Sequence, residues 1–487
     1  MSTLRKILIV LLVVLVLGLG YVAWAVRGSE GQYSLEQLSG PHPKLADPDP
    51  QTIPTIVIAE PVGWKAGEAP VAAPGLAVTR FADGLDHPRT LAILPNGDVL
   101  AAETNAPPTR GPGGLTGLVM GYLFSKAGAG EPSPNKIVVL RDSNGDGKAD
   151  QRFEMTNPGL DSPFGMVLRE GRLYVANHNA VVSWPFQPGQ TVLQGKPEKL
   201  MDLPGAGNHW ARNLLLSPDG SKLYVTVGSA SNIGEYGMDT EKGRAAIHEY
   251  DFAHKSERLF ASGLRNPNGL DWNPYSNELW TVVNERDMLG PDLVPDYLTN
   301  VPLGAQYGWP WAYWKKNIDW RVTAPMPEYM LEYTRKPEYG LGAHVAPLGL
   351  AFSRGGNVMG GQFASGAFIA RHGSWNRRPL SGYDVVFVRF DNRGNVLPLA
   401  PAPVLSGFLT ADGKTHGRPT WVAFAKDGAL LVSDDTGGVI WRVTSPGASP
   451  APAVKAIADT PLPPMPKMTG KIHFQQNADS DLLKPQQ

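Results

Sequence analysis

Short runs of alternating apolar and polar residues recur along most of this chain, and each is followed by a turn and a second such run. Residues 91–103 (LAILPNGDVLAAE) and 165–177 (GMVLREGRLYVAN) show the pattern. A period of two places alternate side chains on opposite faces of a strand, and an Asn-Gly, Asp-Gly or Glu-Gly turn joins two strands into a hairpin. The same unit returns at residues 213–229, 269–285, 348–373 and 421–443.

A repeated hairpin is typical of a β-propeller, in which small antiparallel sheets surround a central channel. Six hairpins predict an all-β, six-bladed β-propeller over residues 76–444, whereas a double β-sandwich would not need a repeated unit. The loops that lead into the first strand of each blade would open onto the channel, so their polar residues should converge on one site. Apart from an N-terminal apolar run, no amphipathic helix longer than three turns is expected.

The N-terminal apolar run covers residues 7–26, which follow Arg5 and Lys6. At ~1.5 Å per residue it can cross a hydrocarbon core of ~30 Å, and the basic residues before it favour a body on the outer side. We predict a membrane anchor at residues 1–27, with a signal segment cleaved near residues 23–25 as the alternative. The propeller would then face the periplasm from the inner membrane, or otherwise be secreted to the periplasm.

The segments on either side of the predicted propeller are rich in proline and lack a sustained period. Residues 28–75 are interpreted as a linker with a first irregular layer. Residues 445–487 are interpreted as a Pro-rich tail that is expected to be disordered.

Composition and missing motifs narrow the chemistry. A formal net charge of −1 gives no electrostatic basis for binding nucleic acid. The chain has no cysteine, which excludes disulfides, thiolate zinc sites, a lipobox and covalently attached c-type haem. It also has no Gly-x-Gly-x-x-Gly after a strand, no Gly-x-Ser-x-Gly, no His-Glu-x-x-His and no P-loop.

Two basic side chains stand immediately before predicted blade strands. His209 follows a glycine-rich stretch in residues 204–220, and Arg265 lies with Asn266 between two glycines in residues 263–274. At the mouth of a strand, His209 would reach the channel, and Arg265 could present five donors to anionic or carbonyl oxygens. The alternative for Arg265 is an arginine that bonds backbone carbonyls and joins two blades.

Other predicted blade entrances also carry basic side chains, namely Arg371, His372, Arg377, Arg378, His416 and Arg418. Several cations around one channel predict an anionic ligand with several carboxylates. Each of the two histidines, taken alone, could instead be an ordinary loop residue.

Two stretches are rich in the oxygen ligands that calcium prefers. Residues 284–301 contain four carboxylates, Glu285, Asp287, Asp292 and Asp296, without the spacing of a calcium loop. Residues 142–150 (DSNGDGKAD) match positions 1, 3, 5, 6 and 9 of such a loop, but Phe153 replaces the glutamate of position 12. A peripheral structural calcium and a plain turn both stay open for this loop.

Six stretches can be considered together: GLRNPNGLDW, NERDMLGPDLVPDYL, YGWPW, HVAPLGLAF, HGSWNR and NHWARNLLLSPDG. In combination they resemble the soluble quinoprotein glucose/sorbosone dehydrogenase family, closest to its sorbosone dehydrogenase-like branch, over roughly residues 76–444. The resemblance implies a six-bladed propeller that binds pyrroloquinoline quinone (PQQ), a tricarboxylate, together with calcium (Ca2+).

The resemblance also implies roles for single residues. His209 matches the general base, which takes the proton of the substrate hydroxyl while a hydride passes to the quinone, and Arg265 and Asn266 match residues beside the quinone carbonyls. The other matched positions are the cofactor contacts Asn105, Arg377 and Arg418 and the calcium ligands Glu285, Gly290, Pro291, Ala305 and Tyr307.

The chain departs from the family at two positions. Ser229 stands where an aspartate orients the base, with Glu235 as the candidate substitute, and Thr420 stands where a second arginine is found. A neutral hydroxyl raises the basicity of a histidine less than a carboxylate does.

We therefore predict a PQQ-dependent oxidoreductase that oxidises a sugar or a sugar-derived aldehyde, such as an aldose or sorbosone. Its electrons would pass to a separate acceptor, a membrane quinone or a cytochrome. One alternative is a calcium-dependent lactonase whose metal is bound by Glu103, Asn105, Asn266 and Asp434. The other is a non-enzymatic, sugar-binding propeller, which Ser229 and Thr420 favour.

Overall fold

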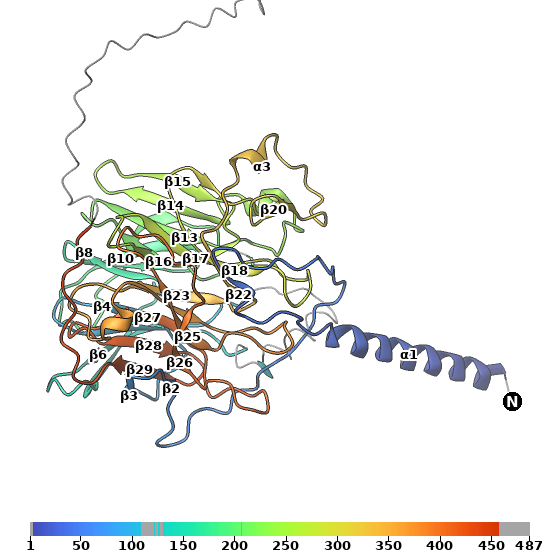
Figure 1. Cartoon of the computed structure of the whole chain (residues 1–487), viewed down its shortest axis with the longest axis horizontal. Helices are drawn as coiled ribbons and strands as arrows, with labels where there is room; N and C mark the ends of the chain where they lie inside the picture. The colour runs from blue at the N-terminus through green and yellow to red at the C-terminus, as the bar shows by residue number, and fades with distance from the viewer. Residues whose placement is uncertain (1–2, 109–120, 122–124, 127–129, 206, 457–487) are drawn as a thin grey trace, which may run out of the picture.

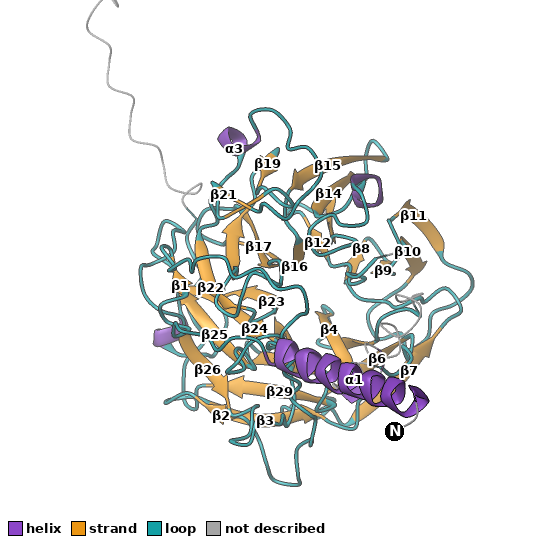
Figure 2. Cartoon of the chain, turned by 90° about the vertical axis from the view of Figure 1, so that its right-hand side faces the viewer, coloured by secondary structure: helices purple, strands orange, loops and turns teal. Residues whose placement is uncertain are grey.

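Antiparallel sheets surround a common centre in the computed structural model, which describes residues 3–108, 121, 125–126, 130–205 and 207–456. Within this part of the chain there are six sheets of four or five strands, arranged as a ring when viewed along the channel (Figure 2). The prediction of an all-β, six-bladed β-propeller is confirmed, and each predicted hairpin contains the two innermost strands of one blade.

The blades follow the chain in order. Blade 1 consists of β4 (Pro88–Ile93), β5 (Val99–Glu103), β6 (Lys136–Arg141) and β7 (Gln151–Thr156). Blade 2 consists of β8 (Met166–Arg169), β9 (Arg172–Ala176), β10 (Ala180–Pro185) and β11 (Glu198–Asp202). Blade 3 consists of β12 (Leu214–Leu216), β13 (Lys222–Val227), β14 (Ala246–Asp251) and β15 (Ser256–Ser262), with β19 (Ala305–Gln306) at its edge.

The last three blades also take up strands from the N-terminal part of the chain. Blade 4 consists of β16 (Asn266–Trp272), β17 (Leu279–Asn284), β18 (Pro295–Asn300), β22 (Tyr339–Ala343) and β1 (Ser39–Gly40). Blade 5 consists of β23 (Pro347–Phe352), β24 (Gly366–Arg371), β25 (Asp384–Arg389), β26 (Ala402–Ser406) and β2 (Val71–Ala72). Blade 6 consists of β27 (Pro419–Phe424), β28 (Leu430–Asp434), β29 (Val439–Thr444) and β3 (Ala77–Ala82).

Blade 6 closes the ring, because its outermost strand β3 comes from the beginning of the propeller and pairs with β29 near its end. Hydrogen bonds also cross the other blade boundaries close to the channel. Gly165 N donates to Arg212 O between blades 2 and 3, and Ser229 N donates to Arg265 O between blades 3 and 4 (2.9 and 2.8 Å). Ser433 Oγ of blade 6 donates to Arg89 O of blade 1 (2.6 Å). These bonds fix the blade entrances relative to one another.

Burial explains why the inner strands read as nearly continuous apolar runs. Every residue of β23 and β24 is buried, whereas the outer strand β7 is mostly exposed. Small residues let the innermost strands approach one another: a Cβ on Gly269 would lie 2.6 Å from Leu348 O of the next blade.

The N-terminal helix α1 (Thr3–Arg27) projects from the propeller and buries none of its residues (Figure 1). It is long and apolar enough to cross a membrane, as the sequence predicted, although a signal sequence would pass the same test. Residues 28–75, predicted as a linker, pack against blades 4 and 5 through β1 and β2. Of the predicted tail, residues 457–487 lie outside the described residues.

The remaining helices are short. Among the described residues they are α3 (Met330–Tyr333), η1 (Met238–Glu241) and η2 (Gly361–Phe363). The first of these belongs to an insertion between β18 and β22, which also contains the small sheet of β20 (Ala312–Tyr313) and β21 (Asn317–Ile318).

Candidate active site

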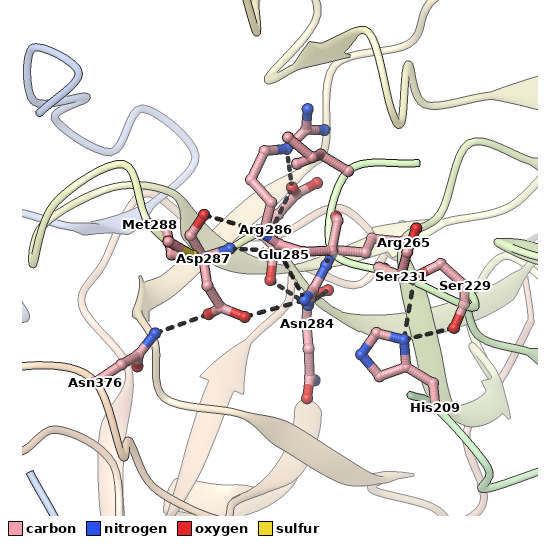
Figure 3. A network of polar contacts seen from close by, with 12 residues as sticks. His209, Ser229, Ser231, Arg265, Asn284, Glu285, Arg286, Asp287, Met288 and Asn376 are labelled. Atoms are coloured by element: carbon pink, nitrogen blue, oxygen red, sulfur yellow. Dashed lines mark hydrogen bonds and ion pairs between the residues drawn. The ribbon is translucent and has the colours of Figure 1, made fainter. Parts of the chain in front are cut away.

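His209 lies at the entrance of blade 3, just before β12, with its imidazole directed at Ser229 (Figure 3). Its Nδ1 is 2.8 Å from the Ser229 carbonyl oxygen and 3.0 Å from Ser229 Oγ. A carbonyl oxygen can only accept, so Nδ1 carries the proton, and Ser229 Oγ donates its own proton to Ser231 O (2.7 Å). The tautomer is thereby fixed, and the other ring nitrogen, Nε2, is the basic one.

The imidazole is neutral at neutral pH. Burial, and secondly the positive charge of Arg265, lower the pKa of His209 to about 3. A neutral histidine with Nε2 unprotonated can accept a proton from a substrate hydroxyl.

The residues that contact His209 are closely packed, and one oxygen among them has no hydrogen-bond donor. A Cβ on Gly228 would lie 2.2 Å from Asn266 Oδ1 and 2.6 Å from His209 Cβ, so only glycine fits there. Asn266 is buried, and its Oδ1 has no hydrogen-bond partner. Because buried polar atoms are seldom left unpaired, this oxygen beside His209 is suited to a ligand donor.

The acid that supports this loop is Glu241, not the predicted Glu235. Glu241 accepts from Ala230 N (2.8 Å) and from Ser231 Oγ, and it is buried. Glu235 accepts from the backbone amides of residues 232 and 233 instead. The proposed substitution of Glu235 for the missing aspartate is therefore wrong, and the acid reaches His209 only through two serines.

Arg265 uses all five of its N–H groups within the protein. Nε donates to Asn232 O, Nη1 to Asn284 O and Glu285 O, and Nη2 to Asn232 Oδ1 and Asp287 Oδ2. These contacts join blades 3 and 4, which is the alternative interpretation of this residue. Its positive charge still lies close enough to His209 to lower the histidine pKa. Arg265 therefore offers the site a fixed charge rather than free donors.

Asp287 connects Arg265 to blade 5. Its Oδ1 accepts from Asn376 Nδ2 (2.8 Å), and its Oδ2 is 3.0 Å from Arg265 Nη2 (Figure 3). The same Oδ1 lies 3.4 Å from His344 Nδ1. The charges of Arg265 and His344 outweigh burial and lower the pKa of Asp287. The same carboxylate raises the pKa of His344. Through Asp287, charged and polar side chains from the entrances of blades 3, 4 and 5 contact one another.

A second polar group joins the entrances of blades 1, 5 and 6. The guanidinium of Arg89 lies over the ring of Trp210, the neighbour of His209, and 3.2 Å from Asp435 Oδ2. His372 Nε2 is 2.9 Å from the same carboxylate. Burial lowers the pKa of His372 to about 4, and Arg418 Nε donates to the His372 carbonyl (3.2 Å). Cations of blades 1 and 6 and a neutral histidine of blade 5 thus gather beside the His209 loop.

The three remaining predicted cofactor contacts lie in different surroundings. Arg418 is half-buried and packs on the ring of Tyr383 in the second polar group. Arg377 is buried and donates to Pro291 O, Pro379 O, Tyr33 O and Asp292 Oδ1, so the structure does not bring it to His209. Asn105 is buried and donates to Glu131 O (2.8 Å).

The five predicted calcium ligands have other partners in the structure. His344 Nε2 contacts Gly290 O and Arg377 Nε donates to Pro291 O. Glu285 is paired with Arg286 (3.0 Å), and Ala305 and Tyr307 pack in an apolar cluster between blades 3 and 4. Among the described residues no three His, Cys, Asp or Glu side chains form a metal-binding group. This includes the loop at 142–150, where Asp142 accepts three backbone amides.

Arg286 provides a stability test for this region. It is fully buried, donates to Glu285, Pro310 O and Ala312 O, and approaches Asp319 to 3.5 Å. Replacing it by alanine leaves two buried carboxylates without this partner, so we expect Arg286→Ala to lower the free energy of unfolding by about 3–5 kcal/mol in urea titrations. The exposed pair Lys199–Asp202 is the control, and Lys199→Ala should cost less than about 1 kcal/mol. Equal losses of unfolding free energy in the two variants would contradict the role of Arg286 as the partner of buried carboxylates.

With this geometry, comparison with known proteins identifies the family. The TrAA12-like family model matches residues 137–296 and 329–446, which include His209, Arg265, Asp287 and Asp435. The chain belongs to the TrAA12-like family. The predicted kinship with PQQ-dependent sugar dehydrogenases is confirmed at this coarse level, while the sorbosone branch stays a prediction.

Two curated proteins match large parts of the chain. A PQQ-dependent pyranose dehydrogenase of Coprinopsis cinerea is 25% identical over 440 residues, which cover 77% of this chain and 55% of the relative. An uncharacterised protein of Borreliella burgdorferi is 33% identical over 238 residues, 48% of this chain and 60% of the relative. The chain therefore spans little more than half the length of these two curated relatives. Among solved structures, a calcium structure of a Trichoderma reesei enzyme of carbohydrate-active family AA12 has a TM-score of 0.62 at 20% identity. The match covers 80% of this TrAA12-like chain and 98% of that chain, and it shows the fold alone.

Five polar residues of the candidate site in this TrAA12-like chain were given no role in the sequence analysis, namely Arg89, Glu241, His344, Asn376 and Asp435. They stand at blade entrances, where the repeat itself could have pointed to them. Asp435, for example, comes directly after β28, as Asp287 comes shortly after β17. His344 and Asn376 lie in two of the stretches that carry the family resemblance, HVAPLGLAF and HGSWNR. For Arg89, Glu241 and Asp435, only the position in the repeat carried a signal.

Proposed function

We propose that this chain is a PQQ-dependent oxidoreductase that oxidises a sugar or a sugar-derived aldehyde, with His209 as the general base. The observation that carries the proposal is the neutral His209, whose tautomer is fixed by the Ser229 carbonyl and whose Nε2 is available, beside an unpartnered buried oxygen of Asn266. The family membership and the activity printed for the Coprinopsis cinerea relative agree with it.

The residues at the blade entrances fit a planar, polyanionic cofactor. Arg418 and Arg89 supply cations beside the His209 loop, and Asn266 Oδ1 supplies an unused acceptor. We propose that Asn266 and Arg418 bind PQQ directly. PQQ, when bound, supplies an electrophilic quinone that accepts the hydride of the substrate. Asn105 and Arg377 stay predictions without support from their surroundings.

The chain's own residues then account for proton transfer and charge. His209 Nε2 accepts the proton of the substrate hydroxyl, or of the hydrate of an aldehyde, and the Ser229 carbonyl, bonded to Nδ1, stabilises the imidazolium that forms. Arg265, fixed by five bonds, stabilises negative charge developing in the channel without moving. Asp287 in turn keeps Arg265 in place through Nη2.

Calcium does not fit the residues predicted for it as they are arranged here. Two of its predicted carbonyl ligands already accept from His344 and Arg377, and its one carboxylate is paired with Arg286. No step above uses a metal ion, and calcium dependence stays a prediction of the family resemblance.

The lactonase alternative is not favoured, because its carboxylates are committed elsewhere. Glu103 is fully buried and paired with Lys136 and Arg152. Asp434 accepts from Arg418 N, Gly437 N and the indole of Trp64. Neither side chain is available as a metal ligand.

Reconstitution tests the proposal. The full chain, purified in detergent, is titrated with PQQ in the presence of either calcium or a chelator, and dye reduction is followed across aldoses and sugar-derived aldehydes. We expect a shift of the quinone absorbance and sugar-dependent reduction of the dye. No shift under either condition would overturn the proposal, and metal-dependent lactone hydrolysis would support the alternative.

Ser229→Ala should have a small effect on the same activity. The hydroxyl is lost, but the backbone carbonyl that fixes the tautomer stays 2.8 Å from Nδ1. We expect kcat to fall by no more than about fivefold, the equivalent of ~1 kcal/mol, in steady-state assays. Ser256→Ala, at an exposed position of β15, is the control. A loss of a hundredfold would mean that the hydroxyl, rather than the carbonyl, orients the base.

For the cellular setting we propose an inner-membrane protein, anchored by α1, with the propeller in the periplasm. The electrons would leave to a separate acceptor, a membrane quinone or a cytochrome, because the chain has no cysteine with which to attach a c-type haem.

A further inference from the structure

The candidate active site and the end of α1 lie at the same face of the propeller. His209 precedes the first strand of blade 3, and Asp287 follows the second strand of blade 4, so both lie at one end of the channel. The turns that join first and second strands, such as residues 425–429, lie at the other end. In the view along the channel, α1 stands in front of the ring of blades (Figure 2).

The segment that follows α1 is fixed to the site face by buried charges. The backbone amides of Gln32 and Tyr33 donate to Asp292 Oδ2 (2.5 and 3.1 Å), in the loop between β17 and β18. Arg377 donates to Tyr33 O (2.9 Å) and pairs with Asp292 (2.8 Å). Only five residues separate Arg27, the last residue of α1, from Tyr33. The propeller therefore cannot turn freely beneath its anchor.

The last turn of α1 itself contacts the same face. Ile56 N donates to Val26 O in the helix (2.9 Å), and the next residue, Val57, donates to Trp375 O (2.8 Å) in the loop after β24. The helix end is thus two hydrogen bonds away from Trp375, whose neighbour Asn376 donates to Asp287 of the site.

Two exposed indoles flank the contacts of Asp287. Trp320 is 85% exposed and Trp375 is 39% exposed. Trp375 adjoins Asn376, and Trp320 adjoins Arg321, which donates to the carbonyls of Asp287 and Met288. Exposed indoles of this kind are typical of surfaces that enter a membrane interface.

Helix α1 carries its own aromatic residues at the same end. Tyr21 and Trp24, 58% and 71% exposed, lie in its last two turns, where the aromatic belt of a membrane-spanning helix is expected. The membrane interface would therefore lie at the level at which α1 joins the propeller.

We propose that the face of the propeller around the candidate active site rests on the lipid bilayer. Trp320 and Trp375 lie in the headgroup region, and the channel opens toward the membrane surface. This goes beyond the proposed oxidation and does not depend on it, because it requires only that α1 crosses the membrane. It also means that partners of the site reach it along the membrane surface.

Exposed tryptophans at a site can also stack on sugars, which is the competing role for these two residues. The contacts favour the bilayer, because Trp375 is tied to the segment that bonds the end of α1, and α1 leaves its apolar side chains exposed. A sugar platform would not need either contact.

The absence of cysteine allows a direct test on the full chain in lipid nanodiscs. Trp320→Cys, Trp375→Cys and, at the opposite face, the exposed Lys426→Cys are each labelled with a fluorescent dye, and the lipids carry spin-labelled headgroups. We expect strong quenching at positions 320 and 375 and little at 426. Equal quenching at all three positions, or stronger quenching at 426, would overturn the proposal whether or not the protein oxidises sugars.

A second measurement keeps the indoles in place. In brominated lipids, the quenching of tryptophan fluorescence should be smaller for the Trp320→Phe, Trp375→Phe double variant than for the unchanged chain. If quenching is unchanged, and Trp320→Ala in detergent raises KM for a soluble sugar more than tenfold, then the indoles bind substrate and the membrane role is wrong.

Discussion

His209→Asn should strongly slow sugar oxidation while leaving the binding of PQQ nearly intact. Asparagine approximates the size of the imidazole near its backbone but cannot accept a proton at the position of Nε2. Loss of a general base typically lowers turnover by about 10²–10⁴-fold, so kcat should fall in that range. The measurement pairs steady-state kinetics with a PQQ titration followed by absorbance. Equal loss of binding and turnover would argue against a role as base.

The pH dependence of stability gives this variant an independent readout. The pKa of His209 is lowered to about 3 in the fold, against about 6.5 for the unfolded chain, so its contribution is present above pH 6.5 and is lost as the pH falls toward 3. At pH 4.5 the unchanged protein should therefore lose about 2–3 kcal/mol of unfolding free energy that His209→Asn does not lose. Urea titrations at pH 7 and 4.5 measure the difference.

A histidine at the surface provides the control for turnover. The His254 side chain is 78% exposed, so His254→Asn should leave turnover unchanged. If the two histidine variants lose turnover alike, the loss of a base at position 209 is not the cause.

The six-bladed architecture could be predicted from the sequence because each inner hairpin records its own pattern. Two buried strands and the turn between them are local features, as in residues 213–229. The number of such hairpins along the chain then predicts the number of blades. The outer strands were less readable, because β1 and β2 are two-residue strands contributed by a segment that reads as a linker. Their pairing depends on distant partners, which no local pattern specifies.

The sequence predicted where the candidate active site lies, but it predicted less well which atoms its side chains bond. His209 and Arg265 stand at blade entrances, as expected, but the sequence could not show that the Arg265 N–H groups are all used within the protein. The sequence likewise could not show that the backbone carbonyl of Ser229 accepts from His209 Nδ1. In the related enzymes an aspartate side chain is expected to orient this histidine. Side chains that bond backbone atoms of another blade leave no pattern in the sequence.

The predicted calcium ligands also show that a sequence does not reveal which backbone atoms are bonded to side chains. Carbonyl oxygens such as Gly290 O and Pro291 O are present in every chain, so their density near a glutamate says little about whether they are free. Here the side chains of His344 and Arg377 donate to them. Only the tertiary structure decides between an ion and a side-chain donor.

Arg265 provides the second large effect, and two substitutions separate its charge from its bonds. Arg265→Gln removes the positive charge near His209 and takes the guanidinium away from Asp287, so we expect kcat to fall by about 10²–10³-fold. Arg265→Lys keeps the charge but cannot reproduce five bonds, and it should retain clearly more activity than the glutamine variant. Steady-state kinetics on both variants, each checked by urea titration, measure the difference.

The pH profile separates the two roles of Arg265 further. Because its charge lowers the pKa of His209, the glutamine variant should show a higher histidine pKa and lose activity at a higher pH on the acidic side, whereas the lysine variant should resemble the unchanged protein. Arg335→Lys, at a partly exposed arginine outside the site, is the matched control and should be silent. If the lysine and glutamine variants lose activity and stability equally, Arg265 serves only to join blades 3 and 4, and negative charge in the channel must be stabilised by other cations, of which Arg418 is the first to test.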